Sequence, residues 1–306
     1  MEGLVIKSTG SQYLVRFDDG SILLCRIRGN MRMKDFEATN PITVGDRVEV
    51  DWKKGDDVGQ INNMLPRKNY IIRKSVKLSR QVQILASNID RAFVVATPVL
   101  PKTSLGFIDR FLATAEAYNI SAGIIWNKAD LYDDEVWSFV DQTKELYESI
   151  GYKVFCVSAV NGFGFKSLLD EMNGKVNLFS GHSGVGKSSL INALIPGMKL
   201  KTAEISAQHQ KGKHTTTFAE MHMIPEGGYI IDTPGIREFG MIDFDTYEVS
   251  HFFPEIFKVS KNCQYGNCIH LNEKDCAVKR AVEEGVIAES RFDSYLSILT
   301  KQDVFK

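Results

Sequence analysis

Residues 181–188, Gly-His-Ser-Gly-Val-Gly-Lys-Ser, have the composition and spacing of a loop that binds phosphate. An apolar run precedes the loop at 176–179 and an amphipathic run follows it at 190–194, which predicts a strand, a loop and a helix. In that context the glycines allow backbone N–H groups to face phosphate oxygens at the positive end of the helix dipole. We expect Lys187 to neutralise the β- and γ-phosphates and Ser188 to bind Mg²⁺. The candidate residues of this loop are Gly181, His182, Ser183, Gly184, Val185, Gly186, Lys187, Ser188 and Ser189.

A second set of residues has the types needed to read a nucleotide base: Asn127, Lys128, Ala129, Asp130, Ser158 and Ala159. The carboxylate of Asp130 can accept both the ring N–H and the exocyclic amino hydrogen of guanine, whereas adenine offers no such pair of donors. A site built on such a pair can reject the wrong base by about 10⁴-fold, so the pattern predicts guanine specificity. We expect Asn127 to brace the phosphate loop and Lys128 to lie along the base. The backbone N–H of Ala159 can meet the guanine carbonyl oxygen.

Two later segments have groups suited to Mg²⁺ and the γ-phosphate: Thr-Thr-Thr at 215–217 and Asp-Thr-Pro-Gly at 232–235. Asp232 can hold Mg²⁺ through water, and the N–H of Gly235 can reach the γ-phosphate. Either Thr215 or Thr216 would supply a hydroxyl to Mg²⁺, and the sequence leaves both open. These groups neutralise charge and position the γ-phosphate, which is most of what phosphoryl transfer requires. The expected ligands are therefore GTP or GDP with Mg²⁺.

The position after Gly235 is Ile236, where Ras-type enzymes carry a glutamine that orients the attacking water. An apolar side chain cannot orient water, so we expect slow hydrolysis by the protein alone. The nearest polar substitute in the sequence is His214, beside the threonines. A histidine on a loop is commonly exposed and idle, whereas its neighbours here favour a catalytic role. Both interpretations of His214 stay open at this stage.

The order of these motifs along the chain is unusual. The base-reading residues come first, and the phosphate loop and the Asp-x-x-Gly segment follow. An ordinary GTPase has the reverse order, with its phosphate loop near the N-terminus. The order therefore indicates a circularly permuted GTPase domain, in which the segment that moves on hydrolysis leads directly into the C-terminal region.

The N-terminal region has short apolar runs separated by turn residues, at 4–6, 13–17, 22–27 and 47–52. This pattern predicts a small β-barrel, for which an OB-fold is the preferred interpretation and a plain packing module the alternative. From residue 89 to 235, apolar strands alternate with amphipathic helices, which predicts parallel βαβ units. We thus expect a multidomain α/β protein: an N-terminal OB-fold, RNA-binding, at 1–70, a permuted P-loop GTPase domain at 71–240 and a helical zinc-binding domain at 241–306.

A basic stretch at 67–80 contains six Lys or Arg residues and no acidic residue. Basic residues interleaved with an aromatic residue can hold an RNA backbone, and a solvated linker is the equally favoured alternative. The formal net charge of the whole chain is -1, which excludes a uniformly basic nucleic-acid binder. Any RNA contact must therefore use a local patch.

The C-terminal region contains the spacing Cys263-x4-Cys268-x-His270-x5-Cys276. Three thiolates and one imidazole complete a tetrahedral zinc shell with no open position, so we predict one structural Zn²⁺. A metal staple suits a region too short to bury a large core. The other two cysteines, Cys25 and Cys156, lie in apolar runs and are expected in the core. With five cysteines, no signal-like N-terminus and no apolar run of membrane-spanning length, we expect a cytoplasmic protein.

With these motifs in place, the chain resembles the bacterial ribosome small subunit-dependent GTPase A family, of the RsgA or YjeQ type. The resemblance spans almost the whole chain and is carried by the permuted motif order, the segments 212–217, 232–236 and 252–255, and the Cys/His spacing. It implies an OB-fold, a permuted GTPase domain and a zinc domain. It also implies late maturation of the small (30S) ribosomal subunit as the role, with 16S rRNA as a partner and ribosome-stimulated hydrolysis. In that family the switch I histidine, here His214, is a proposed catalytic residue.

Two other classes of function remain open. The first is a GTPase that acts at a membrane or on a metal-delivery partner, against which the absence of a basic amphipathic helix and of a His-rich tract counts. The second is a non-enzymatic RNA-binding scaffold, against which the intact Lys187, Ser188 and Asp232 count. We expect a monomer with no membrane partner.

Overall fold

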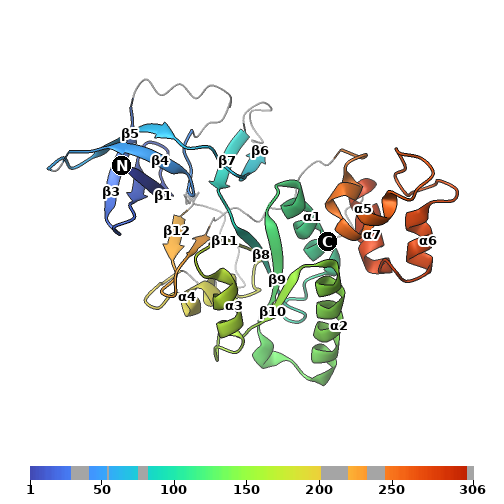
Figure 1. Cartoon of the computed structure of the whole chain (residues 1–306). Coiled ribbons are helices and arrows are strands. Elements are labelled where there is room, and N and C mark those ends of the chain that lie inside the picture. Colours follow the sequence, from blue (N-terminus) through green and yellow to red (C-terminus); the bar gives the residue numbers. More distant parts are fainter. Residues whose placement is uncertain (29–40, 54, 75–81, 201–219, 233–244, 302–306) are drawn as a thin grey trace, which may run out of the picture. The chain divides into compact units, whose positions relative to one another are not determined.

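The computed structural model describes residues 1–28, 41–53, 55–74, 82–200, 220–232 and 245–301 (Figure 1). The chain divides into two compact units. The first comprises Met1–Arg91, Leu169–Phe179 and Glu204–Glu238, and the second comprises Ala92–Leu168, Ser180–Ala203 and Phe239–Lys306. Each unit is described by itself.

The first unit begins with a five-stranded barrel. Its strands are β1 (Glu2–Ser8), β2 (Tyr13–Arg16), β3 (Ile22–Ile27), β4 (Arg47–Asp51) and β5 (Gly59–Met64). They pair in the order β1-β2-β3-β5-β4, β4 pairs back with β1 to close the barrel, and β3 and β5 run parallel. Alternate side chains such as Val5, Val15 and Val48 are fully buried inside it. This topology confirms the predicted OB-fold, and the sequence pattern missed only β5.

The basic stretch is not a solvated linker over its described part. Residues Tyr70–Lys74 form β6, which pairs antiparallel with β7 (Val82–Ser87). Arg67 is nearly buried, and its guanidinium makes two 2.6 Å contacts with the carboxylate of Asp46, which is 0% exposed. Lys68 pairs with Asp90. The linker interpretation is therefore wrong for 67–74, because two of its basic side chains are neutralised by acids distant in sequence; residues 75–81 lie outside the described part.

Three more strands belong to the first unit: β11 (Val176–Ser180), β12 (Glu220–Met223) and β13 (Tyr229–Asp232). β11 and β13 are parallel, as the βαβ pattern predicts. β12 is an exception, since it runs antiparallel to β13 and also to β1 of the barrel. Lys7 on β1 and Glu220 on β12 face each other there, with Nζ and Oε2 3.0 Å apart. The barrel is therefore continuous with a strand of the GTPase sequence.

The second unit contains β8 (Arg91–Ala96), β9 (Ser121–Trp126) and β10 (Lys153–Cys156), with β9 in the middle and parallel to β10. The helices of this unit are α1 (Leu105–Ala117), η1 (Ala129–Leu131), α2 (Asp134–Ile150) and α4 (Lys187–Leu194), and the division between the two units falls within α3 (Phe165–Met172). The predicted alternation of apolar strands with amphipathic helices is confirmed here. α3 was not predicted.

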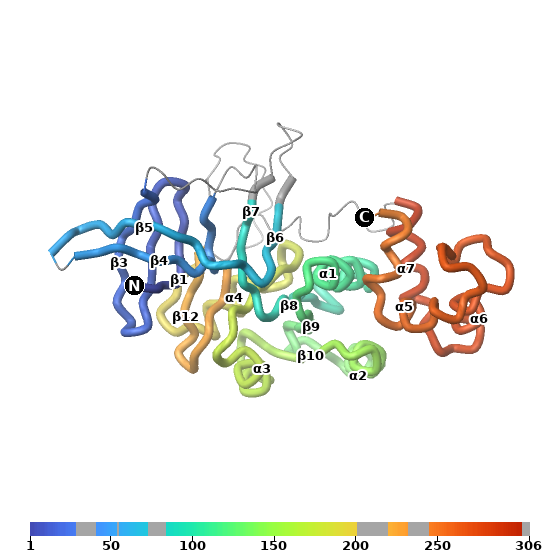
Figure 2. The backbone as a smooth tube through the Cα atoms, turned by 45° about the horizontal axis from the view of Figure 1, so that its top comes forward, coloured from blue at the N-terminus to red at the C-terminus, as the bar shows by residue number. Residues whose placement is uncertain are grey.

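The C-terminal helices are η3 (Val249–Phe252), α5 (Pro254–Ser260), α6 (Ala277–Glu283) and α7 (Glu289–Leu299). Figure 2 shows them gathered beside α1, and their buried core of Phe253, Ile256 and Tyr295 includes Ala113 of α1. Arg291 of α7, 1% exposed, lies in this core with its Nη1 2.8 Å from Asp109 of α1. In the described part of the chain, every helix is too short or too polar to cross a bilayer.

Candidate nucleotide and metal sites

The predicted phosphate loop joins β11 to α4 and has the geometry that its glycines allow. Gly184 and Gly186 have φ of 89° and 86°, a region that favours glycine. A Cβ on Gly186 would lie 2.5 Å from Nδ2 of Asn127, and a Cβ on Gly181 would lie 2.4 Å from the carbonyl oxygen of Val95. Both glycines are therefore required by close approach of other groups. Gly186 is the N-cap of α4, so the backbone N–H groups at the end of the loop lie at the N-terminus of this helix, where they can bind phosphate.

Asn127 connects the base-reading loop to the phosphate loop. It is 1% exposed, its Nδ2 donates to the carbonyl oxygen of Val185 at 2.8 Å, and its backbone N–H donates to Ala96 at 2.9 Å. The two loops are 58 residues apart in sequence, so this bond fixes their separation. The contact is the one expected for Asn127 from the motif.

The remaining base-reading residues lie around the ends of β9 and β10. Lys128 has a left-handed φ of 68°, and its Nζ donates to the carbonyl oxygen of Leu100. Burial lowers the pKa of Lys128, and the charge of Asp130 opposes that shift. Asp130 is exposed, and its Oδ1 accepts from the hydroxyl of Ser158, so the two loops meet through this bond. Ala159, the residue after Ser158, is half-buried.

On the phosphate loop itself, Lys187 and Ser188 are half-buried and Ser183 and Ser189 are exposed. The ring of His182 lies against that of Phe107 on α1, with centroids 3.6 Å apart. Burial lowers the pKa of His182, which favours the neutral ring at this contact. Sequence reasoning missed Phe107, because the contact depends on the packing of α1.

Several predicted residues of the site lie outside the described residues: His214, Thr215, Thr216 and Gly235. Asp232 ends β13, as predicted, and its side chain is not described. The structure thus brings together the base-reading residues and the phosphate loop, all within the second unit.

Cys263, Cys268, His270 and Cys276 converge, with their ligand atoms all within 4.8 Å of one another. Nδ1 of His270 lies 3.6, 3.2 and 3.3 Å from the three sulfurs in chain order, and Sγ of Cys276 lies 3.9 and 3.8 Å from the other two sulfurs. Ligands about 2.0–2.3 Å from a central Zn²⁺ in a tetrahedron are about 3.5–3.8 Å apart, so the four groups fit this ion.

The loop that carries these four residues is held by side chains that the spacing did not indicate. The carboxylate of Glu273 accepts from the backbone N–H groups of Ile269, Leu271 and Asn272 at 2.7, 2.8 and 3.0 Å. The hydroxyl of Tyr295 on α7 donates to the carbonyl oxygen of Ile269 at 2.6 Å. The metal-binding loop is thereby attached to the helical core.

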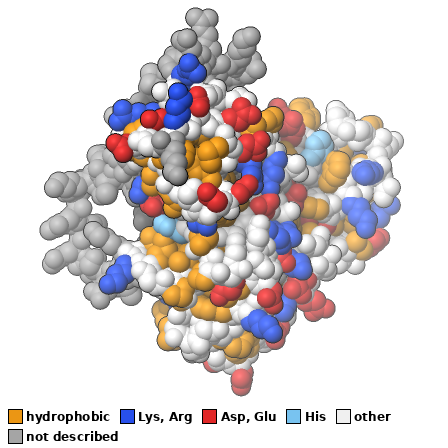
Figure 3. Space-filling view, turned by 60° about the vertical axis from the view of Figure 1, so that its left-hand side comes forward, with side chains coloured by type: hydrophobic (Ala, Val, Ile, Leu, Met, Phe, Trp, Pro, Cys, Tyr) orange, Lys and Arg blue, Asp and Glu red, His pale blue; other side chains and the backbone are white. Residues whose placement is uncertain are grey.

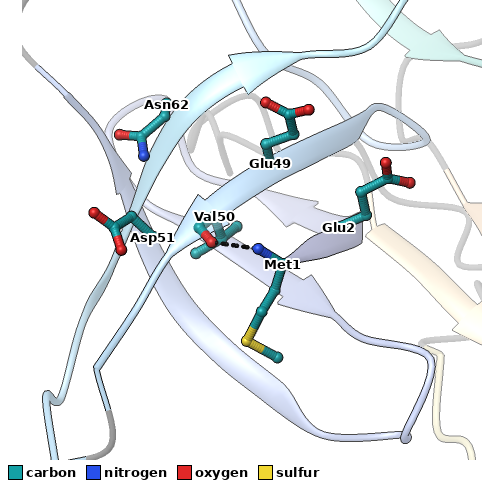
Figure 4. A pocket seen from close by; sticks show the side chains of 6 residues that line it. All are labelled: Met1, Glu2, Glu49, Val50, Asp51 and Asn62. Carbon is teal, nitrogen blue, oxygen red and sulfur yellow. Dashed lines mark hydrogen bonds between the residues drawn. The ribbon is translucent and has the colours of Figure 1, made fainter.

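A surface hollow on the barrel has a partly acidic lining. It is lined by Met1, Glu2, Glu49, Val50, Asp51 and Asn62, and the N-terminal ammonium of Met1 donates to the carbonyl oxygen of Val50 at 2.8 Å (Figure 4). Three of the six residues are acidic and none is Lys or Arg. Acidic and basic side chains are interspersed over the face drawn in Figure 3. Phosphate groups would be repelled at this hollow.

Comparison of the chain with known proteins identifies its family. The RsgA GTPase profile matches residues 64–242, and the RsgA N-terminal domain profile matches residues 2–61. The chain belongs to the RsgA GTPase family. A relative from Bacteroides fragilis, named small ribosomal subunit biogenesis GTPase RsgA, is 54% identical over 99% of this chain and 97% of its own length.

Solved structures of the RsgA type agree with this assignment. YjeQ from Thermotoga maritima is 33% identical with a TM-score of 0.83, and the match covers 100% of this chain and 99% of YjeQ. YloQ, described as a circularly permuted GTPase, is 30% identical with a TM-score of 0.78, over 100% and 96% of the two chains. The permuted order of motifs in the present chain therefore agrees with the description of YloQ as circularly permuted.

Proposed function

We propose that this protein is a GTPase that binds the small ribosomal subunit and assists its late maturation, hydrolysing GTP to GDP and phosphate. The observation that carries the nucleotide part is the bond from Asn127 to Val185, which joins a guanine-type loop to a phosphate loop. The ribosomal part is supported by the name of the relative that is 54% identical over nearly the whole chain.

The roles of individual residues follow from the chemistry of GTP. Lys187 neutralises the β- and γ-phosphates, and the glycine-rich backbone supplies N–H donors to them. Ser188, Asp232 and one of Thr215 and Thr216 would hold Mg²⁺, which would supply charge neutralisation. Asp130 and the N–H of Ala159 read guanine. The half-buried position of Lys187 and the exposure of Asp130 support these roles.

We further propose that the barrel and the basic stretch contact 16S rRNA. The hollow lined by Glu2, Glu49 and Asp51 is unsuited to phosphate, so the contact would use another surface of the barrel. Arg67 and Lys68 are engaged by Asp46 and Asp90, which leaves the basic residues from 73 to 80 as the candidates. Work on ribosomal subunits implies a cytoplasmic protein, and we propose that it acts as a monomer.

Zinc at the Cys/His cluster has a structural role in this proposal, since four protein ligands leave no position for a substrate. The proposed domains are residues 1–70, 71–240 and 241–306. The family profiles, which end at 61 and 242, support a division close to these boundaries.

His214 is proposed to orient the attacking water once the subunit has docked, because Ile236 cannot. Hydrolysis should be slow alone and rise on addition of purified small subunits, by about 10³ to 10⁵-fold if the gain resembles that of other partner-activated GTPases. His214→Ala should keep GTP affinity and subunit binding and lose most of the stimulation. Lys187→Ala serves as the control that loses nucleotide binding itself. An absence of stimulation in the wild type would overturn the proposed ribosomal role, and full stimulation in His214→Ala would make His214 a bystander.

A further inference from the structure

The carbonyl group that precedes Lys128 is held by a side chain outside the guanine motif. Lys128 has a left-handed φ of 68°, a conformation that a non-glycine residue keeps only when its surroundings fix it. The N–H of Ala129 donates to Val157 at 3.0 Å on one side of this turn. On the other side, the hydroxyl of Tyr132 donates to the carbonyl oxygen of Asn127 at 2.6 Å. Both peptide planes that flank Lys128 are therefore anchored.

Tyr132 is itself fixed by the start of α2. Asp133 is the N-cap of this helix and accepts from the N–H of Val136 at 2.9 Å. Tyr132 precedes the N-cap and contacts Trp137 in the first turns, with ring centroids 5.1 Å apart at 72°. This is the arrangement of a hydrophobic staple, which sets the angle at which a chain enters a helix. Burial raises the pKa of Tyr132 well above its ordinary value, so the hydroxyl keeps its proton.

The same aromatic residues reach the second guanine-reading loop. The ring of Trp137 meets that of Phe163 with centroids 6.0 Å apart at 71°. The carbonyl oxygen of Phe163 accepts from the N–H of Ser158 at 3.1 Å, which closes the loop that begins at Ser158. The Ser158 hydroxyl in turn donates to Asp130. A continuous chain of contacts therefore runs from Asn127 through the three aromatic residues to Ser158 and from there to Asp130, which lies in the same loop as Asn127.

We propose that Tyr132, Trp137 and Phe163 act as an aromatic clamp that sets the distance between the two loops that read guanine. Tyr132 is a positioning residue in this clamp, because it acts through Asn127 and Lys128 rather than on the nucleotide. The inference rests on the proposed guanine site. Its consequence is that base discrimination depends on a hydroxyl group that touches no nucleotide.

The test compares dissociation constants for GDP, for IDP, which lacks the exocyclic amino group, and for inorganic diphosphate. Tyr132→Phe should weaken GDP binding by about 10-fold and shrink the ratio of IDP to GDP dissociation constants, because Asp130 loses its alignment with the amino group. Diphosphate binding should not change. In turnover, KM for GTP should rise while kcat at saturation is retained, since the lost interaction serves binding.

Two matched comparisons separate positioning from general stability. Tyr152→Phe removes a hydroxyl that bonds to Glu116 at 3.1 Å, so it controls for the loss of a tyrosine hydrogen bond elsewhere in the unit. Trp137→Ala should reproduce the loss of discrimination, and Trp137→Phe should restore most of it. If Tyr132→Phe lowers the melting temperature yet keeps the wild-type IDP-to-GDP ratio, the clamp proposal is wrong. If the wild type itself fails to prefer GDP over IDP and ADP, the proposed guanine site is wrong instead.

Discussion

Replacing Arg291 with methionine should loosen the packing of the C-terminal helices on α1. Arg291 is 1% exposed, with Nη1 2.8 Å from Oδ1 of Asp109 on α1 and Nε 2.7 Å from Oε1 of Glu255 on α5. Methionine would retain much of the apolar packing and leave the carboxylate of Asp109, 0% exposed, with the Tyr147 hydroxyl at 2.7 Å as its described partner. Removing one partner of a buried pair costs about 3–5 kcal/mol. For a unit of this size that corresponds to a drop in Tm of about 6–20 °C.

The assay is thermal unfolding combined with limited proteolysis, in which cleavage after residue 245 reports loosening of the C-terminal helices. Arg280→Met on the exposed surface of α6 is the matched control and should change stability by no more than about 0.5 kcal/mol. The double variant Arg291→Met with Asp109→Leu should recover part of the loss, because Asp109 no longer contributes a buried charge, whereas Glu255 still lacks the guanidinium of Arg291. If Arg291→Met behaves like Arg280→Met, the network contributes no net stability and the argument fails.

Three further predictions concern the two sites. Gly186→Ala should reduce GDP affinity at least about 10-fold, because the added Cβ would lie 2.5 Å from Nδ2 of Asn127. The assay is a titration with fluorescent GDP. Gly197→Ala is the control for backbone strain, since Gly197 also has a positive φ but a Cβ there would have nothing within 4 Å. Asp130→Asn should shift nucleotide preference from guanine toward xanthine, and competition between GDP and XDP checks this. Cys268→Ser should abolish a stoichiometric zinc content and expose the C-terminal helices to protease, since structural zinc contributes on the order of 10 kcal/mol of apparent folding free energy. The control Cys156→Ser should retain the metal, because Cys156 lies outside the Cys/His cluster. Unchanged protease resistance in the metal-free variant would contradict the last of these.

Features encoded by neighbouring residues were predictable from the sequence. The phosphate loop, the turn at Gly20 between β2 and β3 and the short spacing of the Cys/His cluster each depend on few residues, so their geometry follows from residue type. The helices α1 and α2 were predictable for the same reason, because an apolar stripe at helical spacing is a local pattern.

Features that depend on distant partners were not predictable. In the sequence, Arg67 is one of six basic residues in a stretch without acidic residues. Its partner Asp46 is 21 residues away and is brought into contact only by folding. Asp109 and Arg291 are 182 residues apart, and each alone reads as a surface charge. Phe107 contacts His182 of the phosphate loop, which lies far from it along the chain, and no motif contains this contact. The sequence around a charged or hydroxyl side chain does not indicate which distant residue will form its ion pair or hydrogen bond in the folded protein.

Each compact unit is built from segments that are far apart in the sequence. The base-reading residues, the phosphate loop and the C-terminal helices all belong to the second unit, where Asn127, Phe107 and Arg291 tie them together. The two strands between the threonine segment and the Asp-x-x-Gly segment, β12 and β13, belong instead to the first unit, where β12 pairs with β1 of the barrel. Glu220, which bonds to Lys7 of the barrel, is only four residues after Thr216. Here β1 of the N-terminal barrel and β12, the strand that follows the threonines, are hydrogen-bonded neighbours in one sheet, so the barrel is joined directly to the strand next to the threonine segment.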